Sequence, residues 1–338
     1  MTAPLVGIAR MAAASPVLEA KSRVEYFELE ARSILNRCSS ARMPFPWTIN
    51  PYRGCEFGCH YCYARYTHEF LELRESKQFE EKIYAKSRAA ELLREELRRR
   101  REGAIAIGTA TDPYQPAERR FGITRSLLEV LAGERGREIS ITTKSDLVAR
   151  DAELLREVGR RNVLHINVTV TTTDAELARK LEPRAPRPDL RLGAVAALAA
   201  AGLSVGVFLN PILPGLTDGV ANLDAVAAAA ARAGARYLGG GILFLMPSAQ
   251  REFFPFLDRE FPELAPRYRA RFERSPYLRG EYAGMIRRRV ARIRARHGLE
   301  ASPRGYEPEA GGDPQLPLFD FCGFLALATL PSEVSRRA

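Results

Sequence analysis

Between residues 47 and 245, short apolar segments alternate with longer helical ones, and this alternation constrains the fold more than any other feature. We predict strands over 47–52, 104–108, 139–143, 163–171, 203–210 and 237–245. We expect helices between them over 87–101, 124–131, 151–160, 189–201 and 217–233, the last capped by Thr217 or Asp218. Alternating strands and helices form parallel sheets, because each return to the sheet needs a crossover. Six such units predict an α/β fold, a partial (β/α)6 TIM-type barrel rather than a closed barrel of eight.

The regions outside this alternating body differ in composition. We expect residues 1–44 to form an N-terminal extension, with one short helix over 24–35, and residues 45–246 to form the barrel. The sequence that follows is charged and punctuated by proline, which predicts a helical C-terminal cap over 247–300. Residues 301–338 open with a stretch rich in proline, glycine and acidic residues, which is typical of a linker and tail.

Three of the five cysteines, Cys55, Cys59 and Cys62, lie within eight positions, directly after the first predicted strand. Thiolates at these gaps can bind one face of an iron–sulfur cube and leave the fourth iron open to a small molecule. An open iron suggests catalysis rather than electron storage. The alternative is a structural zinc ion, which needs a fourth protein ligand. The candidates for that ligand are His60, His68 and Cys38.

Polar side chains follow several predicted strands at their carboxyl ends, where reactive groups gather in parallel sheets. They lie in 109–112, at Lys144, in 169–173 and in 210–214. A lysine at a strand end can pair with a carboxylate, and threonine hydroxyls can bond a ribose. The alternatives are a surface lysine and threonines that serve β-strand formation.

The chain is basic, with 51 lysines and arginines against 41 acidic residues and a formal charge of +10. This excess favours a polyanionic partner, because each phosphate that a protein neutralises releases counterions. Basic blocks occur over 98–101, 267–274 and 287–296, and their alternative role is a solvated helix face. No stretch approaches the ~20 apolar residues that a membrane helix needs, so we expect a cytoplasmic protein without a membrane partner. The clustered cysteines fit a reducing compartment.

The cysteine loop, C-x3-C-x2-C with Tyr61 before the last cysteine, resembles the signature loop of the radical S-adenosylmethionine (SAM) superfamily. This resemblance implies a [4Fe-4S] cluster held by Cys55, Cys59 and Cys62, with the amino and carboxylate groups of SAM on the fourth iron. An external electron donor would drive reductive cleavage of SAM to methionine and a 5′-deoxyadenosyl radical. That radical would take a hydrogen atom from the substrate.

Over roughly residues 45–250 the chain is similar to the spore photoproduct lyase-related, DNA-repair-type branch of that superfamily. The residues that carry the likeness are Tyr61 and Tyr63, 109–112 with Gln115 and Glu118, Thr143 and Lys144, 182–184 to Arg191, and 211–215. The likeness implies that Lys144 meets the SAM carboxylate, Thr169 its ribose or amino acid moiety, and the Tyr61 backbone its adenine. Thr109 and Arg184 are further candidates for SAM binding. Tyr61 and Tyr63 are candidates for a hydrogen-atom relay, and Cys322 is a remote one.

One departure concerns the chemistry. In the spore photoproduct lyases proper, a cysteine near the end of the second strand supplies a hydrogen atom to the repaired base. Here residues 106–112 read Ala-Ile-Gly-Thr-Ala-Thr-Asp and contain no cysteine, which argues against the spore photoproduct reaction itself. The leading hypothesis is therefore a radical SAM enzyme that acts on another modified or damaged DNA base. The alternatives are an RNA or peptide substrate, or a non-catalytic metal- or DNA-binding module.

A second signal lies in the tail. The segment Gln315, Leu316, Pro317, Leu318 and Phe319 resembles the pentapeptide by which bacterial replication and repair proteins dock on the β sliding clamp. Leucine and phenylalanine can fill an apolar pocket, and the central proline keeps the peptide extended. In the alternative, these apolar side chains pack back on the barrel as its last element.

Overall fold

The computed structural model of the chain describes residues 5–21, 23–39, 43–99 and 103–302. The expected clamp-binding segment, residues 315–319, and Cys322 lie outside the described residues. The boundaries expected at residues 44, 246 and 300 stay predictions.

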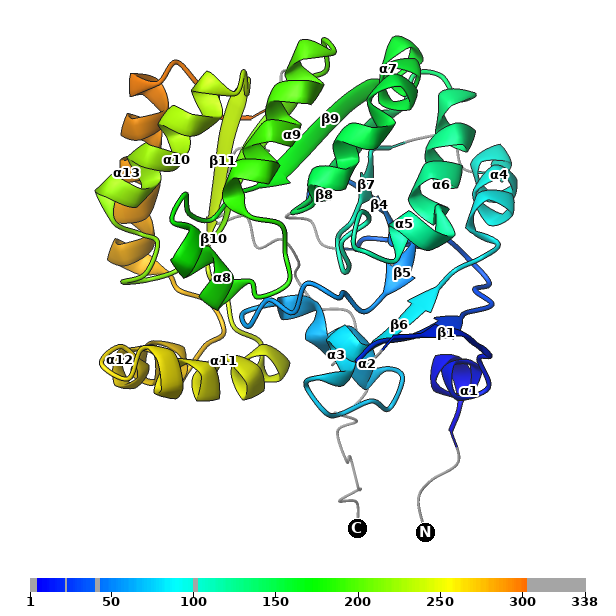
Figure 1. The fold of residues 1–338 in the computed structure, drawn as a ribbon, viewed down its shortest axis with the longest axis horizontal. Helices are drawn as coiled ribbons and strands as arrows, with labels where there is room; N and C mark the ends of the chain where they lie inside the picture. The colour runs from blue at the N-terminus through cyan, green and yellow to red at the C-terminus, as the bar shows by residue number, and fades with distance from the viewer. Residues whose placement is uncertain (1–4, 22, 40–42, 100–102, 303–338) are drawn as a thin grey trace, which may run out of the picture.

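A seven-stranded sheet forms the centre of the fold, in the order β11-β10-β9-β8-β7-β4-β3 (Figure 1). Six strands run parallel and follow one another in chain order, and β3 pairs antiparallel with β4 at one edge. The strands are β3 (Leu35–Arg37), β4 (Trp47–Ile49), β7 (Ile105–Ile107), β8 (Glu138–Thr143), β9 (Val163–Thr169), β10 (Val205–Ile212) and β11 (Tyr237–Ile242). The predicted α/β class, its parallel sheet and all six of its strands are confirmed.

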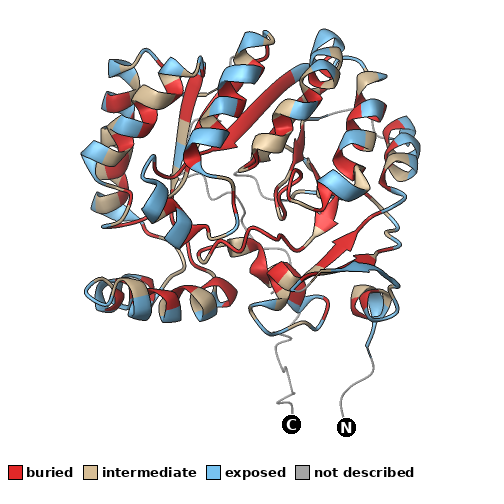
Figure 2. Cartoon of the chain, viewed as in Figure 1, coloured by how far each residue is buried: buried red, intermediate tan, exposed pale blue. Residues whose placement is uncertain are grey.

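Helices return the chain from each parallel strand to the next. They are α4 (Ala89–Arg99), α6 (Ile123–Ala132), α7 (Ala152–Arg161), α9 (Pro188–Ala200) and α10 (Val220–Arg232), and Figure 1 shows them in sequence order along the outside of the sheet. In α4, Ala89, Leu93 and Leu97 recur every four residues, so one face of the helix is buried. Figure 2 shows the same division, with buried strands and exposed outer helix faces.

The expected cap of α10 is wrong. Its N-cap is Gly219, which makes no side-chain hydrogen bond. Thr217 Oγ1 instead accepts from the Leu213 N–H at 2.8 Å, and Asp218 Oδ1 accepts from the Gly215 N–H at 2.8 Å. These two side chains close the loop between β10 and α10 rather than the helix end.

The helix expected over 24–35 is also wrong, because this region forms β2 (Glu25–Glu28) and then β3. A second sheet has the order β1-β2-β6-β5, in which β2 pairs with strands on both sides. Its other members are β1 (Val17–Ala20), β5 (Tyr52–Arg53) and β6 (Lys82–Ala85). The aromatic pair Tyr26 and Phe27 is buried in β2, where a pleated strand suits aromatic side chains. The helix α1 (Gly7–Ala13) precedes this sheet.

Short helices follow the cysteine loop and several strand ends. They are η1 (Tyr63–Arg65), α2 (Tyr66–Glu69), α3 (Gln78–Glu81), α5 (Glu118–Phe121), η2 (Asp146–Asp151) and α8 (Ala175–Leu181). After β11 come three further helices, α11 (Pro247–Glu260), α12 (Ala265–Phe272) and α13 (Gly280–Arg296). Helix α11 contacts η1 and α12, and α13 packs on α10 and β11 (Figure 1). Within the described part of the chain, no helix is long and apolar enough to cross a membrane.

Candidate active site

A cleft of about 930 Å³ opens where the parallel strands end. It brings together eight of the nine candidate site residues from the sequence, although they come from four separate segments of the chain. These eight are Cys55, Cys59, Tyr61, Cys62, Tyr63, Thr109, Lys144 and Thr169. The ninth, Arg184, is not among the residues that line the cleft. The cleft joins a set of thiols to a lysine, two phenols and several hydroxyls.

The first part of the cysteine loop is held by the segment after β7. The side-chain amide of Gln115 donates to the Gly54 carbonyl at 3.0 Å and accepts from the Glu56 N–H at 3.0 Å. The Thr111 hydroxyl donates to the same Gly54 carbonyl at 2.5 Å. Gln115 is fully buried, so its orientation is fixed by these bonds. Residues of the strand end thus shape the loop that carries the cysteines.

Gly54 itself allows the loop to approach its neighbours closely. Its φ of +81° lies in the left-handed region that favours glycine. A Cβ atom there would lie 2.8 Å from the carbonyl oxygens of Phe79 and Lys82. The next residue, Cys55, donates its N–H to the Phe79 carbonyl at 2.9 Å. A side chain at residue 54 would therefore displace the first cysteine.

The three thiols sit in an environment that fits a cationic group. Cys55 and Cys59 are buried and Cys62 is half-buried. Burial raises the pKa of all three thiols, and repulsion by neighbouring cysteines adds to the rise for Cys55 and Cys59. They become thiolates only where positive charge compensates, as ligated iron does. A [4Fe-4S] cube takes each thiolate on a different iron, so three cysteines that line one cavity suit it.

The residues considered as a fourth zinc ligand lie elsewhere. His60 pairs through Nδ1 with Glu252 at 2.9 Å and stacks on Phe256, with ring centres 4.2 Å apart. His68 bonds through Nε2 to the Lys82 carbonyl at 3.0 Å. Neither histidine lines the cleft, and Cys38 does not line it either. Among the described residues, no three His, Cys, Asp or Glu side chains are grouped so as to hold one metal ion.

Tyr61 connects the cysteine loop to a buried ion pair. Its hydroxyl donates to Glu182 Oε1, and Arg191 Nη2 lies 2.5 Å from Glu182 Oε2. Thr171 adds a hydrogen bond to Glu182 Oε1 at 3.2 Å. Burial acts to raise the pKa of Glu182, but Arg191 and Lys144 outweigh it and hold that pKa below its ordinary value. Burial and the Glu182 charge raise the pKa of Tyr61, so the phenol keeps its proton.

Lys144 is placed by Asp112, which sequence reasoning gave no role. The buried Asp112 carboxylate accepts from the Lys144 backbone N–H at 2.7 Å and from the Thr143 hydroxyl at 2.6 Å. These bonds fix the end of β8 and leave the Lys144 side chain free to reach into the cleft. Its ammonium lies 3.4 Å from the Asn210 carbonyl and 5.6 Å from the centre of the Tyr61 ring. The cleft thus contains a lysine ammonium beside the cysteine loop.

Tyr63 lies on the opposite side of Cys62 from Tyr61 in the sequence. Its hydroxyl donates to the Thr109 carbonyl, and its ring packs on Phe244 with centres 5.1 Å apart. Burial raises the pKa of Tyr63, so this phenol is protonated as well. The Asn50 side chain donates to the Thr109 hydroxyl at 3.0 Å and holds the same strand end.

Arg184 is the one site candidate that does not line the cleft. Its backbone N–H donates to the Phe57 carbonyl at 3.1 Å, and its Nη2 atom lies 3.8 Å from Glu80. Glu80 is already paired with the buried Arg65 at 2.7 Å. A contact of Arg184 with SAM stays a prediction. The nearby Arg191 is buried and donates to the carbonyl of Thr169, which lines the cleft, at 3.1 Å.

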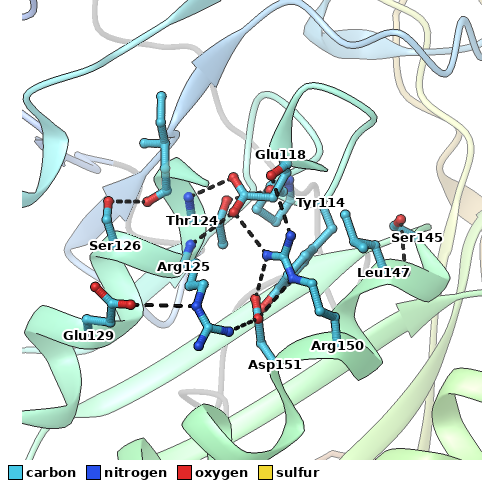
Figure 3. Close-up of polar contacts among 12 residues, drawn as sticks. Tyr114, Glu118, Thr124, Arg125, Ser126, Glu129, Ser145, Leu147, Arg150 and Asp151 are labelled. Atoms are coloured by element: carbon cyan, nitrogen blue, oxygen red, sulfur yellow. Dashed lines mark hydrogen bonds and ion pairs between the residues drawn. The ribbon is translucent and has the colours of Figure 1, made fainter. Parts of the chain in front are cut away.

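A second ionic network, with buried carboxylates, supports the segment after β7 that carries Gln115 (Figure 3). Glu118 accepts from the Tyr52 hydroxyl at 2.5 Å, from the Arg125 N–H at 3.0 Å and from Arg150 at 3.3 Å. Asp151 pairs with the same two arginines, at 2.6 Å to Arg125 and 2.9 Å to Arg150. The network ties α5, α6 and η2 together, so the segment that carries Gln115 rests on a rigid base.

Comparisons with known proteins agree with this geometry. Residues 49–224 match the sequence profile of the Radical SAM superfamily. The chain belongs to the radical SAM superfamily. An uncharacterised protein of Mycobacterium tuberculosis is 39% identical to this radical SAM protein over 290 residues, which cover 85% of each chain. An uncharacterised protein of Methanocaldococcus jannaschii is 27% identical over 252 residues, covering 72% of this chain and 86% of that protein.

Solved structures extend the comparison to the fold of this radical SAM enzyme. A variant of spore photoproduct lyase superposes with a TM-score of 0.60 and 14% identity, over 88% of this chain and 86% of that one. Another variant, with bound AdoMet and dinucleoside spore photoproduct, gives a TM-score of 0.58 at 14% identity, over 81% and 80% of the two chains. At such low identity the likeness establishes the fold alone.

Proposed function

We propose that this enzyme cleaves SAM reductively at a [4Fe-4S] cluster and directs the resulting 5′-deoxyadenosyl radical to a modified or damaged DNA base. The observation that carries the proposal is the cleft, where three thiols, a lysine ammonium and two protonated phenols lie together. We also propose that the parallel sheet is a partial barrel. Residues 1–44 would then be its N-terminal extension, and residues 247–300 would be its C-terminal cap. We infer a cytoplasmic location and an external electron donor.

Cys55, Cys59 and Cys62 would hold the cluster, which supplies the electron for SAM cleavage when bound. The protein's part is to hold these thiolates in place and to keep water away. Gln115 holds the backbone on both sides of Cys55. Apolar side chains that line the cleft, such as Phe79, exclude water from it.

Lys144 would bind the carboxylate of SAM. Among the described residues, the ammonium has only the Asn210 carbonyl oxygen at hydrogen-bond distance, so it can take a carboxylate partner in the cleft. The hydroxyls of Thr109 and Thr169 line the same cleft and can bond a ribose. The Tyr61 backbone would meet the adenine, and Arg184 would have to turn from Glu80 to join them.

Tyr61 and Tyr63 would relay a hydrogen atom. Tyr61 is buried and Tyr63 is partly buried, and the pKa of both phenols is raised, so each retains an O–H hydrogen that it can give to a carbon radical. They also flank the third cysteine in the sequence, so their rings stand beside the place where the radical would form. Glu182 and the Thr109 carbonyl orient the two hydroxyls.

The basic balance of the chain and the fold shared with spore photoproduct lyase support a DNA substrate. One structure of that lyase is complexed with dinucleoside spore photoproduct, a DNA lesion. RNA and peptide substrates are the competing hypotheses. The tail segment that resembles a clamp-binding peptide, Gln315 to Phe319, would bring the enzyme to replicating DNA.

Isotope transfer tests the substrate directly. Cluster-loaded enzyme is given SAM, reductant and either damaged duplex DNA, RNA or a peptide library, each deuterated at carbon. We expect deuterium in 5′-deoxyadenosine with damaged DNA, and a reduced yield of repaired product in Tyr63→Phe. Deuterium that comes from RNA or peptide and never from DNA would overturn the substrate assignment.

A further inference from the structure

Three arginines converge on a pocket away from the thiols. This pocket, of about 640 Å³, lies between α12, α13 and the loop that follows β10. Arg267 and Arg271 come from α12, and Arg289 comes from α13. Of the described residues that line it, Asp218 is the one carboxylate. The pocket is therefore strongly positive.

The Asp218 carboxylate does not neutralise the two arginines of α12. Its Oδ1 accepts from the Gly215 N–H at 2.8 Å, and its Oδ2 accepts from the Tyr282 hydroxyl at 2.8 Å. Across the described part of the chain, no carboxylate lies within ion-pair distance of Arg267 or Arg271. These two guanidinium groups are exposed and keep all their donors for a ligand.

The walls of the pocket are already fixed. The buried Tyr268 donates its hydroxyl to the Pro214 carbonyl at 2.7 Å, which ties α12 to the loop after β10. The Arg271 guanidinium lies 5.0 Å from the centre of the Tyr282 ring, and Arg289 donates to the Asp218 carbonyl. Because these contacts hold Arg271 and Arg289 in place, binding an anion would order chiefly the Arg267 side chain.

The cleft and the pocket meet at the end of β10 and the loop that follows it. Asn210 and Pro211 line the cleft, and Pro214 and Gly215 line the arginine pocket. Three residues span at most about 11 Å, so one extended ligand can reach both places. Figure 1 shows α12 beside α11, which contacts the helix η1 directly after the cysteine loop.

We propose that this pocket binds a backbone phosphate of the nucleic acid whose base enters the cleft. The forked guanidinium of arginine matches the oxygens of a phosphate, and two arginines without a carboxylate partner among the described residues give the pocket charge to neutralise it. This role rests on the proposed function and adds to it, because the phosphate anchor sets where along a strand the reactive base lies. Phosphate contacts position a nucleic acid without reading its sequence.

The test compares two variants of the cluster-loaded, full-length protein. In the double variant Arg267→Gln, Arg271→Gln, both unpaired guanidinium groups of the pocket are removed. The matched control is Arg269→Gln on the same helix, because Arg269 is paired with Asp258 at 2.6 and 2.8 Å and does not line the pocket. Affinity for duplex DNA is measured between about 50 and 200 mM salt, where phosphate contacts dominate its salt dependence.

We expect the double variant to lose roughly tenfold or more in DNA affinity at low salt and to show a salt slope smaller by about 1 to 2. The control should bind within about twofold of wild type. Both variants should still cleave SAM without DNA, because the pocket does not touch the thiols. If wild type binds DNA tightly and the double variant keeps the same salt slope, the pocket does not bind a backbone phosphate. The proposed function is not affected by that result.

Two other outcomes would also contradict the proposal that the pocket binds a backbone phosphate. If wild type binds no nucleic acid, both the pocket and the DNA substrate are wrong, while cleavage of SAM still reports on the radical chemistry. If the salt dependence of DNA affinity is unchanged in the double variant but its binding to polyglutamate is lost, the pocket binds an acidic protein rather than a phosphate.

Discussion

The side-chain amide of Gln115 hydrogen-bonds the backbone on both sides of Cys55. Its Nε2 donates to Gly54 and its Oε1 accepts from Glu56, each at 3.0 Å. Both groups of the amide are therefore used, and the residue is fully buried. The first cysteine of the loop is held by a residue 60 positions away in the sequence.

Gln115→Ala should weaken cluster retention. It leaves the Gly54 carbonyl with a single side-chain bond and the Glu56 N–H without a partner, and each buried group left unsatisfied costs about 1–3 kcal/mol. Because supporting residues tune metal affinity by about 10–100-fold, we expect at least tenfold faster iron loss to a chelator. The control is Gln78→Ala, whose amide makes an exposed bond to Glu75. Equal rates of iron loss in the two variants would show that Gln115 does not position the loop.

Glu182→Gln should destabilise the fold strongly. It removes the charge that compensates the buried Arg191, and breaking a buried pair in this way costs about 3–5 kcal/mol. The measurement is the urea midpoint at pH 7.5. Glu260→Gln, in an exposed pair with Lys180, serves as the control and should change the midpoint little. Similar midpoints for both variants would mean that the buried pair contributes no more than a surface one.

Lys144→Gln should weaken SAM binding without unfolding the protein. The contact with Asp112 is made by the backbone N–H of Lys144, so it survives the substitution. Loss of a hydrogen bond to a charged group costs about 1.5–3 kcal/mol, which corresponds to a roughly 10–100-fold higher Kd for SAM by calorimetry. Lys180→Gln, on the exposed surface, should leave the Kd unchanged. A normal Kd in Lys144→Gln would exclude the lysine from the carboxylate.

Stability should fall as the pH drops below about 6.5, because burial lowers the pKa of His68 to about 4. The unfolded chain then binds a proton that the folded chain excludes, so the contribution is complete above pH 6.5 and is lost towards pH 4. Between pH 7.5 and 5.5 the loss is about 1.3 kcal/mol in urea unfolding. In His68→Gln, which retains an amide donor for the Lys82 carbonyl, this part of the pH dependence should disappear. The same loss in both proteins would assign it to another group.

The sequence predicted the six parallel strands because each is a short apolar run that local periodicity reveals. It also predicted that these strand ends lie together, because carboxyl ends of parallel strands meet at one edge of a sheet and bring Thr109, Lys144 and Thr169 to the cysteines. The second sheet could not be predicted in the same way. Strand β2 is completed by β6, more than 50 residues later, and that pairing leaves no local signal.

The supporting side chains could not be predicted for a related reason. The sequence places Asp112 in a strand-end segment and Arg191 in a stretch similar to the family, but it indicates no role for either. Their roles depend on partners that only the fold brings near, Lys144 for the one and Glu182 for the other. Sequence position also does not reveal which of the two nearby arginines, Arg184 and Arg191, is the buried one.

The most direct test of the central claim is cleavage of SAM by the anaerobically reconstituted enzyme with a strong reductant. We predict stoichiometric 5′-deoxyadenosine and methionine from wild type carrying four irons per chain, and none from Cys59→Ala. A fully loaded wild-type enzyme that forms no 5′-deoxyadenosine would contradict the account, and so would cleavage at the normal rate by Cys59→Ala.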